Sequence, residues 1–342
     1  MRADELSPWR FCVAPMMECT DRHFRYFARL LSSRARLYTE MVTAAALLHG
    51  DPARLLRHDP FEYPLALQLG GSDPAQLAAA AKLGAATGHC EINLNVGCPS
   101  ERVQSGRFGA CLIAEPGLVA ECVAAMAEAV AVPVTVKTRL GVDELDSHDH
   151  LCGLIAGVAR AGCRVILLHA RKAILGLDPR DNRRIPPLDY ERVRRIKRDF
   201  PELTIVLNGG LTSLGAAAAE LPFVDGVMLG RASYDTPWLL AGVDAALFGD
   251  AQPSTSRRKA VEAFMPYLTA ETAAGTPARH LTRHLLGLFA GLPGAREWRR
   301  MLSEEIPRND RPLRLLASAL DKVAGAGDAT VHDAPSRTQS AR

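Results

Sequence analysis

The stretch EINLNVGCPS (91–100) combines a short strand pattern with an abrupt turn. Ile92, Leu94 and Val96 alternate with polar residues, which is typical of a β-strand, and Gly97 to Ser100 then read as a turn. A strand that ends in a turn carrying a cysteine and follows two asparagines suggests chemistry at its carboxyl end. The question for the rest of the chain is whether other strands end in the same way.

Seven further apolar runs have this form, and helix-like stretches lie between most of them. The runs are FCVAPMM (11–17), LYTEMV (37–42), LALQLG (65–70), VTVKTR (134–139), VILLHA (165–170), TIVLNGG (204–210) and GVMLGR (226–231). The helical stretches cover 21–31, 74–87, 116–130, 148–160, 189–199 and 213–220. Strand and helix alternating through eight strands predict a (β/α)8 TIM barrel of the α/β class. The turn after the first run lacks the glycine fingerprint of a doubly wound sheet.

Most of these runs end in polar residues or glycine. The polar ones are Gln68, Asn95, Cys98, Lys137, Arg139, His169, Asn208 and Arg231. Any one of them taken alone is as well explained as a capping or loop residue. In a barrel the carboxyl ends of all strands meet at one mouth, where active sites lie, so the set predicts a site there.

Residues 251–256 read as a linker, and helical patterns over 257–274, 277–291, 294–306 and 312–325 follow it. We therefore expect a barrel domain over 1–250, a helical bundle domain over 251–325 and a disordered tail over 326–342. From residue 251 onward, 14 Lys and Arg face 9 Asp and Glu, so the basic part of the chain is the C-terminal part.

Composition excludes several other classes. The 342 residues contain no apolar run of about 18, so no membrane span is expected. None of the eight cysteines lies in a CxxC pair, so we expect no zinc site, reduced thiols and a cytoplasmic location.

The seventh and eighth runs end in Asn208–Gly209–Gly210 and Gly230–Arg231. Barrels often bind phosphate in the loops after these two strands, although plain tight turns would look the same. Other mouth residues suit a flavin mononucleotide (FMN): apolar Pro15, Met16 and Met17 for the ring face, Gln68 for its edge, Lys137 for negative charge, and His169 for phosphate or ring. A phosphorylated sugar remains an alternative ligand.

Cys98 is the candidate catalytic residue. An ordinary thiol is mostly protonated at neutral pH and can donate a proton, but it becomes a nucleophile where its surroundings lower its pKa. Cys111, within FGACL, is the competing cysteine, and its apolar neighbours favour a packing role.

Together these stretches resemble the tRNA-dihydrouridine synthases, and specifically their A subfamily. The residues that carry the resemblance are APMMECTDRHFRYFARLLS (14–32), LYTEMVT (37–43), ALQLGGSDP (66–74), EINLNVGCPS, RFGACL (107–112), VPVTVKTR (132–139), HARKA (169–173), NRRIPPLDY (182–190), LNGG (207–210), MLGR (228–231) and RHLLGLFAGLPGAREWRRMLSE (283–304). Each motif is weak alone, but their order and spacing are specific and cover about residues 10–320.

The resemblance implies an FMN-binding barrel and a helical bundle that helps to hold tRNA. It implies that FMN, reduced by NADPH, reduces the C5–C6 double bond of uridines 20 and 20a in the D-loop. Cys98 then corresponds to the proton donor, and Asn95 to a contact with the target nucleotide. The FMN contacts correspond to Pro15, Met16, Met17, Gln68, Lys137, His169, Asn208, Gly209, Gly210, Gly230 and Arg231, and the tRNA contacts to Arg180, Arg183, Arg296 and Arg299.

Basic clusters over 171–198 and 279–300 are consistent with phosphate contacts, although solvated helix faces have the same composition. We expect tRNA as the partner of a monomer, with no DNA or membrane contact. The alternatives are an FMN-dependent reductase of free pyrimidines, a tRNA-binding protein without chemistry, and, more remotely, a barrel phosphate lyase or isomerase.

Overall fold

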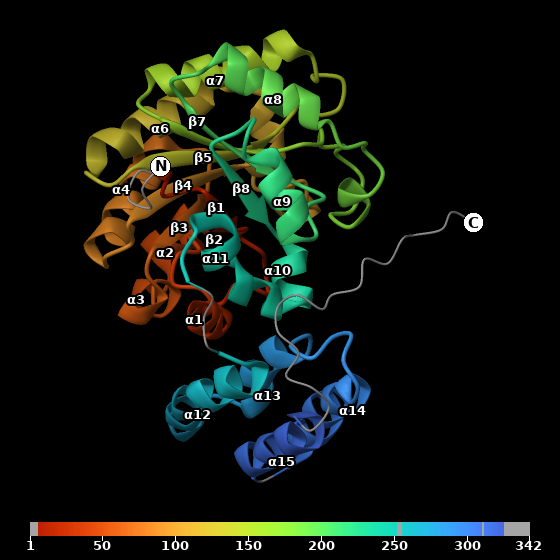
Figure 1. Ribbon diagram of the computed structural model, residues 1–342. Coiled ribbons are helices and arrows are strands. Elements are labelled where there is room, and N and C mark those ends of the chain that lie inside the picture. The colour runs from red at the N-terminus through yellow and green to blue at the C-terminus, as the bar shows by residue number, and fades with distance from the viewer. Residues whose placement is uncertain (1–5, 252–254, 310, 325–342) are drawn as a thin grey trace. The chain divides into compact units, whose positions relative to one another are not determined.

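The computed structural model describes residues 6–251, 255–309 and 311–324. The expected tail at 326–342 lies outside this range. Eight parallel strands form one sheet in the order β1-β8-β7-β6-β5-β4-β3-β2 (Figure 1). The strands are β1 (Phe11–Val13), β2 (Leu37–Thr43), β3 (Leu65–Gly70), β4 (Glu91–Val96), β5 (Val134–Arg139), β6 (Val165–His169), β7 (Thr204–Asn208) and β8 (Gly226–Leu229).

The sheet closes between its first two strands. A parallel bridge joins Cys12 to Arg36, where the amide of Val13 donates to the carbonyl of Arg36 at 2.9 Å and the amide of Arg36 donates to the carbonyl of Phe11 at 3.0 Å. This pairing leaves no free edge between β1 and β2, so the predicted (β/α)8 barrel is confirmed.

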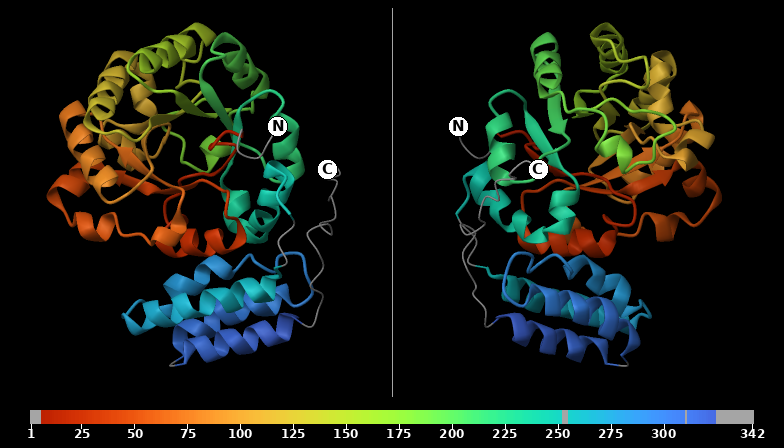
Figure 2. Two further views of the ribbon diagram at one scale, coloured as in Figure 1. Left: turned by 60° about the vertical axis from the view of Figure 1, so that its left-hand side comes forward. Right: turned by 90° about the vertical axis from the view of Figure 1, so that its right-hand side faces the viewer.

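Helices follow the strands along the chain (Figures 1 and 2). They are α1 (Arg22–Leu31), α2 (Ala44–His49), α3 (Pro52–Leu55), α4 (Pro74–Ala86), α5 (Glu101–Ser105), α6 (Pro116–Ala129), α7 (His148–Arg160), α8 (Tyr190–Asp199), α9 (Leu214–Glu220), α10 (Arg231–Asp235) and α11 (Val243–Phe248). Several begin at a side-chain cap. Asp73, Ser147, Asp189 and Ser213 each accept a bond from a backbone amide of the first turn.

Buried side chains, most of them on the strands, form a core in the barrel. Cys12, Ala14, Tyr38, Ala66, Val165, Leu167, Val206 and Met228 form one buried cluster against which Trp9 packs. This packed interior supports the strands from within and leaves their carboxyl ends to form the site.

The chain divides into two compact units. The first contains the chain up to Arg25 together with Arg34–Gly230, and the second contains Tyr26–Ser33 together with the chain from Arg231. The second unit thus takes in residues 231–250, which the sequence assigned to the barrel domain. In this unit Tyr26, in the middle of α1, stacks on Tyr267 with ring centroids 4.0 Å apart.

The remaining helices are α12 (Arg257–Ala273), α13 (Ala278–Thr282), α14 (Ala295–Arg300) and α15 (Pro312–Ala324). The helix predicted over 277–291 is confirmed in its first half, where α13 and a 3₁₀ turn over Arg283–Leu285 lie, and turns replace it from residue 286. A Cβ at Gly287 would lie 1.9 Å from the carbonyl oxygen of Asp235, so the backbone passes this residue too closely for a side chain. None of the helices in the described part is long and apolar enough to cross a lipid bilayer.

Candidate active site

The carboxyl ends of the strands bring most of the predicted residues together. Strand register places Asn95 opposite Lys137, and His169 opposite both Arg139 and Asn208. Gln68, on β3, joins this group because its side-chain oxygen accepts a bond from the Asn95 amide at 2.9 Å. Residues from five strands therefore meet at one mouth.

The Cys98 turn is held by Asn95. The side-chain oxygen of Asn95 accepts from the backbone amides of Gly97 at 3.1 Å and Cys98 at 2.9 Å. The carbonyl of Cys98 accepts from the amide of Ala110 at 2.9 Å. Cys98 is partly exposed, and its thiol donates to the Ser100 hydroxyl at 3.5 Å. The cysteine is thus fixed mainly through its backbone.

Asn95 does more than the sequence predicted. Both lone pairs of its oxygen are used by the Cys98 turn, and one N–H is used by Gln68. Within the described residues the second N–H has no partner, so this donor is what Asn95 has left to offer a bound base.

Cys111 lies in a 3₁₀ segment over Gly109–Ala114, and its thiol donates to the carbonyl of Phe108 at 3.0 Å. Burial raises the pKa of this thiol. These contacts support the packing role expected for Cys111.

Lys137 reaches across the mouth. Its Nζ donates to the side-chain oxygen of Asn208 at 3.1 Å, and the Asn208 amide donates to the carbonyl of Met228 at 2.8 Å. Burial and, to a smaller extent, the nearby Arg139 guanidinium together lower the pKa of Lys137 from 10.5 to about 7. A ligand that brings negative charge would restore the protonated form.

His169 experiences the same crowding of cations. Burial holds its pKa well below the usual range, and Arg139, Lys137, Arg171 and Arg183 each lower it further. His169 is therefore neutral at physiological pH, and the mouth around it is suited to an anionic ligand.

The turn after β7 is shaped by glycine. Gly209 and Gly210 have φ of 109° and 71°, values that favour glycine. A Cβ on Gly209 would lie 2.5 Å from Cδ2 of His169. The Tyr190 hydroxyl donates to the carbonyl of Gly209 at 2.6 Å. Tyr190 was not predicted as a site residue, since only the fold brings the start of α8 to this turn.

The first and last loops complete the predicted set. Pro15 and Met16 are partly buried, whereas Met17 is 56% exposed. A Cβ on Gly230 would meet Met16 Sδ at 3.6 Å, so these two residues are neighbours. Arg231 is exposed and begins α10.

Arg139 connects the Cys98 turn to the basic loop after β6. This buried guanidinium donates to the carbonyls of Gly97 at 2.8 Å, Lys172 at 3.2 Å and Asn182 at 3.3 Å. Asn182 is fully buried, and its amide donates to the carbonyls of Ile174 and Leu177. The loop that carries Arg180 and Arg183 is thereby fixed beside the turn.

Of the four predicted tRNA contacts, Arg180 is exposed and Arg183 partly buried in this loop. Arg296 and Arg299 are both exposed on α14 of the second unit. Their neighbour Arg300 differs, because it forms ion pairs with Glu297 and Glu305 at 2.7 Å.

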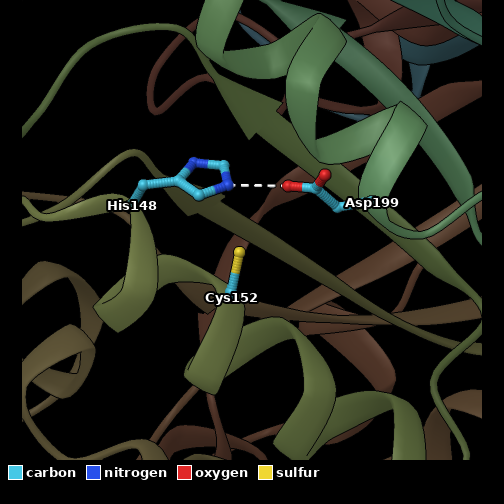
Figure 3. Close-up of side chains that lie close together, drawn as sticks. All are labelled: His148, Cys152 and Asp199. Atoms are coloured by element: carbon cyan, nitrogen blue, oxygen red, sulfur yellow. Dashed lines mark hydrogen bonds and ion pairs between the residues drawn. The ribbon is translucent and has the colours of Figure 1, made fainter.

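Away from the mouth, His148, Cys152 and Asp199 lie together (Figure 3), with their ligand atoms within 4.8 Å of one another. His148 and Asp199 already share a hydrogen bond of 2.7 Å, and burial raises the pKa of the Cys152 thiol, with Asp199 adding to the effect. His148 and Cys152 lie on α7 and Asp199 lies on α8, so the hydrogen bond joins these two helices. The expectation that the chain has no metal site stays a prediction.

Comparison with known proteins identifies the family. The model of the dihydrouridine synthase family matches residues 12–324. The chain belongs to the dihydrouridine synthase family. It is 56% identical over 317 residues to the tRNA-dihydrouridine(20/20a) synthase of Pseudomonas syringae pv. tomato, covering 92% of this chain and 94% of that one.

Two other relatives carry the same name. The tRNA-dihydrouridine(20/20a) synthase of Shewanella oneidensis is 54% identical over 314 residues, covering 92% of this chain and 93% of that one. That of Escherichia coli K12 is 54% identical over 317 residues, covering 92% of each. The predicted membership of the A subfamily of dihydrouridine synthases is confirmed.

Proposed function

We propose that this chain reduces uridine in tRNA to 5,6-dihydrouridine, at positions 20 and 20a, with FMN as cofactor and NADPH as reductant. The observation that carries the proposal is the Cys98 turn. It is fixed by Asn95 directly beside Lys137, at a mouth crowded with cations. The family and its relatives supply the reaction, which is the formation of dihydrouridine in tRNA. A thiol and a cation at one site suit it, the first as a proton donor and the second as a partner for negative charge.

The mouth fits a flavin. Dihydrouridine synthases are flavin-dependent enzymes. Gly209 and Gly210 allow close approach of a phosphate to the backbone, and Lys137 and neutral His169 lie beside them. The predicted residues from Pro15 to Gly230 would hold FMN here, and Arg231 as a further FMN contact stays a prediction. When bound and reduced by NADPH, FMN supplies the hydride that adds to C6 of uracil.

The residues of the chain then handle the charge and the proton. Hydride addition at C6 leaves negative charge on C5 and O4 of the base. Cys98 holds a proton on Sγ and gives it to C5, which completes the reduced ring. Lys137 becomes fully protonated next to negative charge and stabilises it.

Asn95 offers its remaining N–H to the uracil edge. Since a base within a folded tRNA is stacked, the target uridine must leave its stack to reach the mouth.

Four arginines whose side chains are exposed or partly exposed suit the tRNA backbone. Arg180 and Arg183 lie on the loop that Arg139 ties to the Cys98 turn, and Arg296 and Arg299 lie on α14. We propose that these four contact phosphates, which makes binding weaken steeply with salt. A tRNA-binding role for residues 251–325, a barrel domain over 1–250, a monomeric state, a cytoplasmic location and the absence of DNA and membrane contacts stay predictions.

The test is direct. The purified protein is incubated with NADPH and tRNA that lacks dihydrouridine, and the product is mapped by mass spectrometry of nuclease fragments. Cys98→Ala removes the proton donor, and Cys111→Ala is the matched control because its thiol is bonded to Phe108. We expect dihydrouridine at 20 and 20a, a loss of about 10²–10⁴-fold with Cys98→Ala and little change with Cys111→Ala.

The same assay separates the alternatives. Turnover of free uridine or uracil, with no dihydrouridine in tRNA, would replace the proposal by a reductase of free pyrimidines. A Cys98→Ala protein as active as the wild type would overturn the proton-donor assignment.

A further inference from the structure

A line of buried polar side chains runs from the far end of β4 to the Cys98 turn. Glu91, Asn93 and Asn95 occupy alternate positions of β4 and so share one face of the strand. Register places Asn93 between Gln68 on β3 and Thr135 on β5. Glu91, Asn93 and Thr135 are fully buried, Gln68 is 1% exposed and Asn95 is 8% exposed.

Each member of this line is bonded to the next. The Thr135 hydroxyl donates to Glu91 at 2.5 Å, and the Asn93 amide donates to Thr135 at 2.8 Å. The Gln68 amide donates to Asn93 at 2.7 Å, and the Asn95 amide donates to Gln68 at 2.9 Å. We call these five residues the buried hydrogen-bond chain, and its last oxygen holds the amides of Gly97 and Cys98.

Glu91 fixes the direction of the buried hydrogen-bond chain, that is, which group of each pair donates and which accepts. Its carboxylate accepts from the Trp9 indole at 2.8 Å, the Arg36 guanidinium at 3.0 Å and the Tyr38 hydroxyl at 2.8 Å, as well as from Thr135. Thr135 has one hydroxyl proton, which it donates to this carboxylate. Toward Asn93 its hydroxyl oxygen can therefore only accept.

The same constraint passes along the amides. Because the Asn93 nitrogen must face Thr135, its oxygen faces Gln68, and the Gln68 nitrogen faces Asn93. The Gln68 oxygen then faces Asn95, which leaves the Asn95 oxygen for the Cys98 turn. If every donor and acceptor were exchanged, the NH2 group of Asn95 would face the backbone N–H groups of Gly97 and Cys98. Two donors cannot bond to each other, so the turn would lose both hydrogen bonds.

We propose that Thr135 is a positioning residue for Cys98. Through Asn93 and Gln68 it sets the direction of the Asn95 amide, and that amide sets the geometry of the Cys98 turn. Among the described residues, the Thr135 hydroxyl bonds to Glu91 and Asn93 and to no other group, so its effect on the reaction is indirect. The consequence for dihydrouridine formation rests on the proposed function, whereas the consequence for Cys98 itself does not.

Three variants of the purified flavin-bound protein test this. Thr135→Val keeps the shape of the side chain but removes the hydroxyl that gives the buried hydrogen-bond chain its direction. Thr135→Ser keeps the hydroxyl and is the rescue. Tyr38→Phe is the matched control, because it removes a donor from the same Glu91 oxygen but lies outside the chain.

The first measurement is the rate at which iodoacetamide alkylates Cys98, followed by peptide mass spectrometry across a pH series. We expect Thr135→Val to change this rate by about fivefold or more, the factor that corresponds to one buried hydrogen bond. Thr135→Ser and Tyr38→Phe should follow the wild type. If Thr135→Val does not fold, Asn93→Asp breaks the same link, since it replaces the amide that donates to Thr135.

The second measurement is dihydrouridine formation in a single turnover of enzyme that NADPH has already reduced. We expect Thr135→Val to slow this step about 10- to 100-fold, as misplacement of a reacting group does. Reduction of the flavin by NADPH should stay within about twofold, because Cys98 takes no part in that step.

The outcomes separate two failures. The positioning role would be overturned if Cys98 were alkylated at the same rate in the wild type, Thr135→Val and Tyr38→Phe. It would also be overturned if Thr135→Val and Tyr38→Phe changed this rate by the same factor. Altered alkylation in Thr135→Val alone, with a wild type that makes no dihydrouridine, would uphold the positioning role and overturn the proposed function.

Discussion

Replacement of Glu91 by glutamine tests how the barrel tolerates a buried charge at the base of its site. The Glu91 carboxylate accepts four hydrogen bonds, two on each oxygen, and its side chain is fully buried. Glu91→Gln preserves size and shape. It replaces one oxygen by an NH2 group, which donates and does not accept.

The loss can be worked from these contacts. Whichever way the new amide turns, two donors face its nitrogen: Trp9 and Arg36, or Tyr38 and Thr135. Each buried donor left unpaired costs about 1–3 kcal/mol. Arg36, whose side chain is 8% exposed, also loses its counter-charge, and breaking a buried ion pair costs about 3–5 kcal/mol. Because these two costs overlap at Arg36, we expect a fall of about 4 kcal/mol in the free energy of unfolding.

Urea unfolding followed by circular dichroism measures this quantity. Glu121→Gln on the exposed face of α6 is the matched control and should stay within about 0.5 kcal/mol of the wild type. A Glu91→Gln loss as small as that of the control would refute the reasoning, since it would mean that the four donors find other partners without cost.

Three further predictions concern the mouth of the barrel. In flavin-free protein the lowered pKa of Lys137 means that between about pH 7 and 10.5 the unfolded chain binds a proton that the folded chain does not, so stability should rise with pH in this window. Lys137→Met should remove up to about 2 kcal/mol of the increase in unfolding free energy between pH 7.5 and 9, measured by urea titrations. The same pH dependence in Lys137→Met and the wild type would contradict this prediction. Tyr190→Phe frees the carbonyl of Gly209 and should weaken FMN binding about fivefold in fluorescence titrations, with unaltered affinity as the contrary result. Gly209→Ala should yield protein without flavin absorbance, because the new Cβ would clash with His169 and the backbone φ of 109° disfavours a side chain. The control Gly117→Ala on α6, where a Cβ has nothing within 4 Å, should retain the flavin. Equal flavin absorbance in both variants would count against the steric argument.

Several features of the protein were predictable because their signals are local. Apolar runs such as VILLHA and TIVLNGG, separated by helical stretches, predict the barrel without knowledge of which strands pair. The turn after Val96 likewise identifies Cys98 from neighbouring residues alone. Glu91, Asn93 and Asn95 also carried an unused signal, since polar residues at every second position of a buried strand indicate a polar face.

Local signals failed where distant backbone decides the outcome. The helix predicted over 277–291 has a suitable pattern, but α13 ends at Thr282. Further along, Gly287 lies against the carbonyl of Asp235, a contact that the neighbouring residues do not reveal. In the same way, nothing in PPLDY indicates that the Tyr190 hydroxyl reaches Gly209, because the two residues meet only after β7 and α8 have packed.

The sequence by itself therefore determined the barrel and the residues at the carboxyl ends of its strands, because strand periodicity and turn chemistry are properties of adjacent residues. Only the tertiary structure decided how those residues are used. Lys137 on β5 reaches Asn208 on β7 across the mouth, and the direction of the Asn95 amide depends on Glu91 through side chains of three strands. Hydrogen-bond direction is a property of the whole chain of partners, and those partners become neighbours only when the barrel closes.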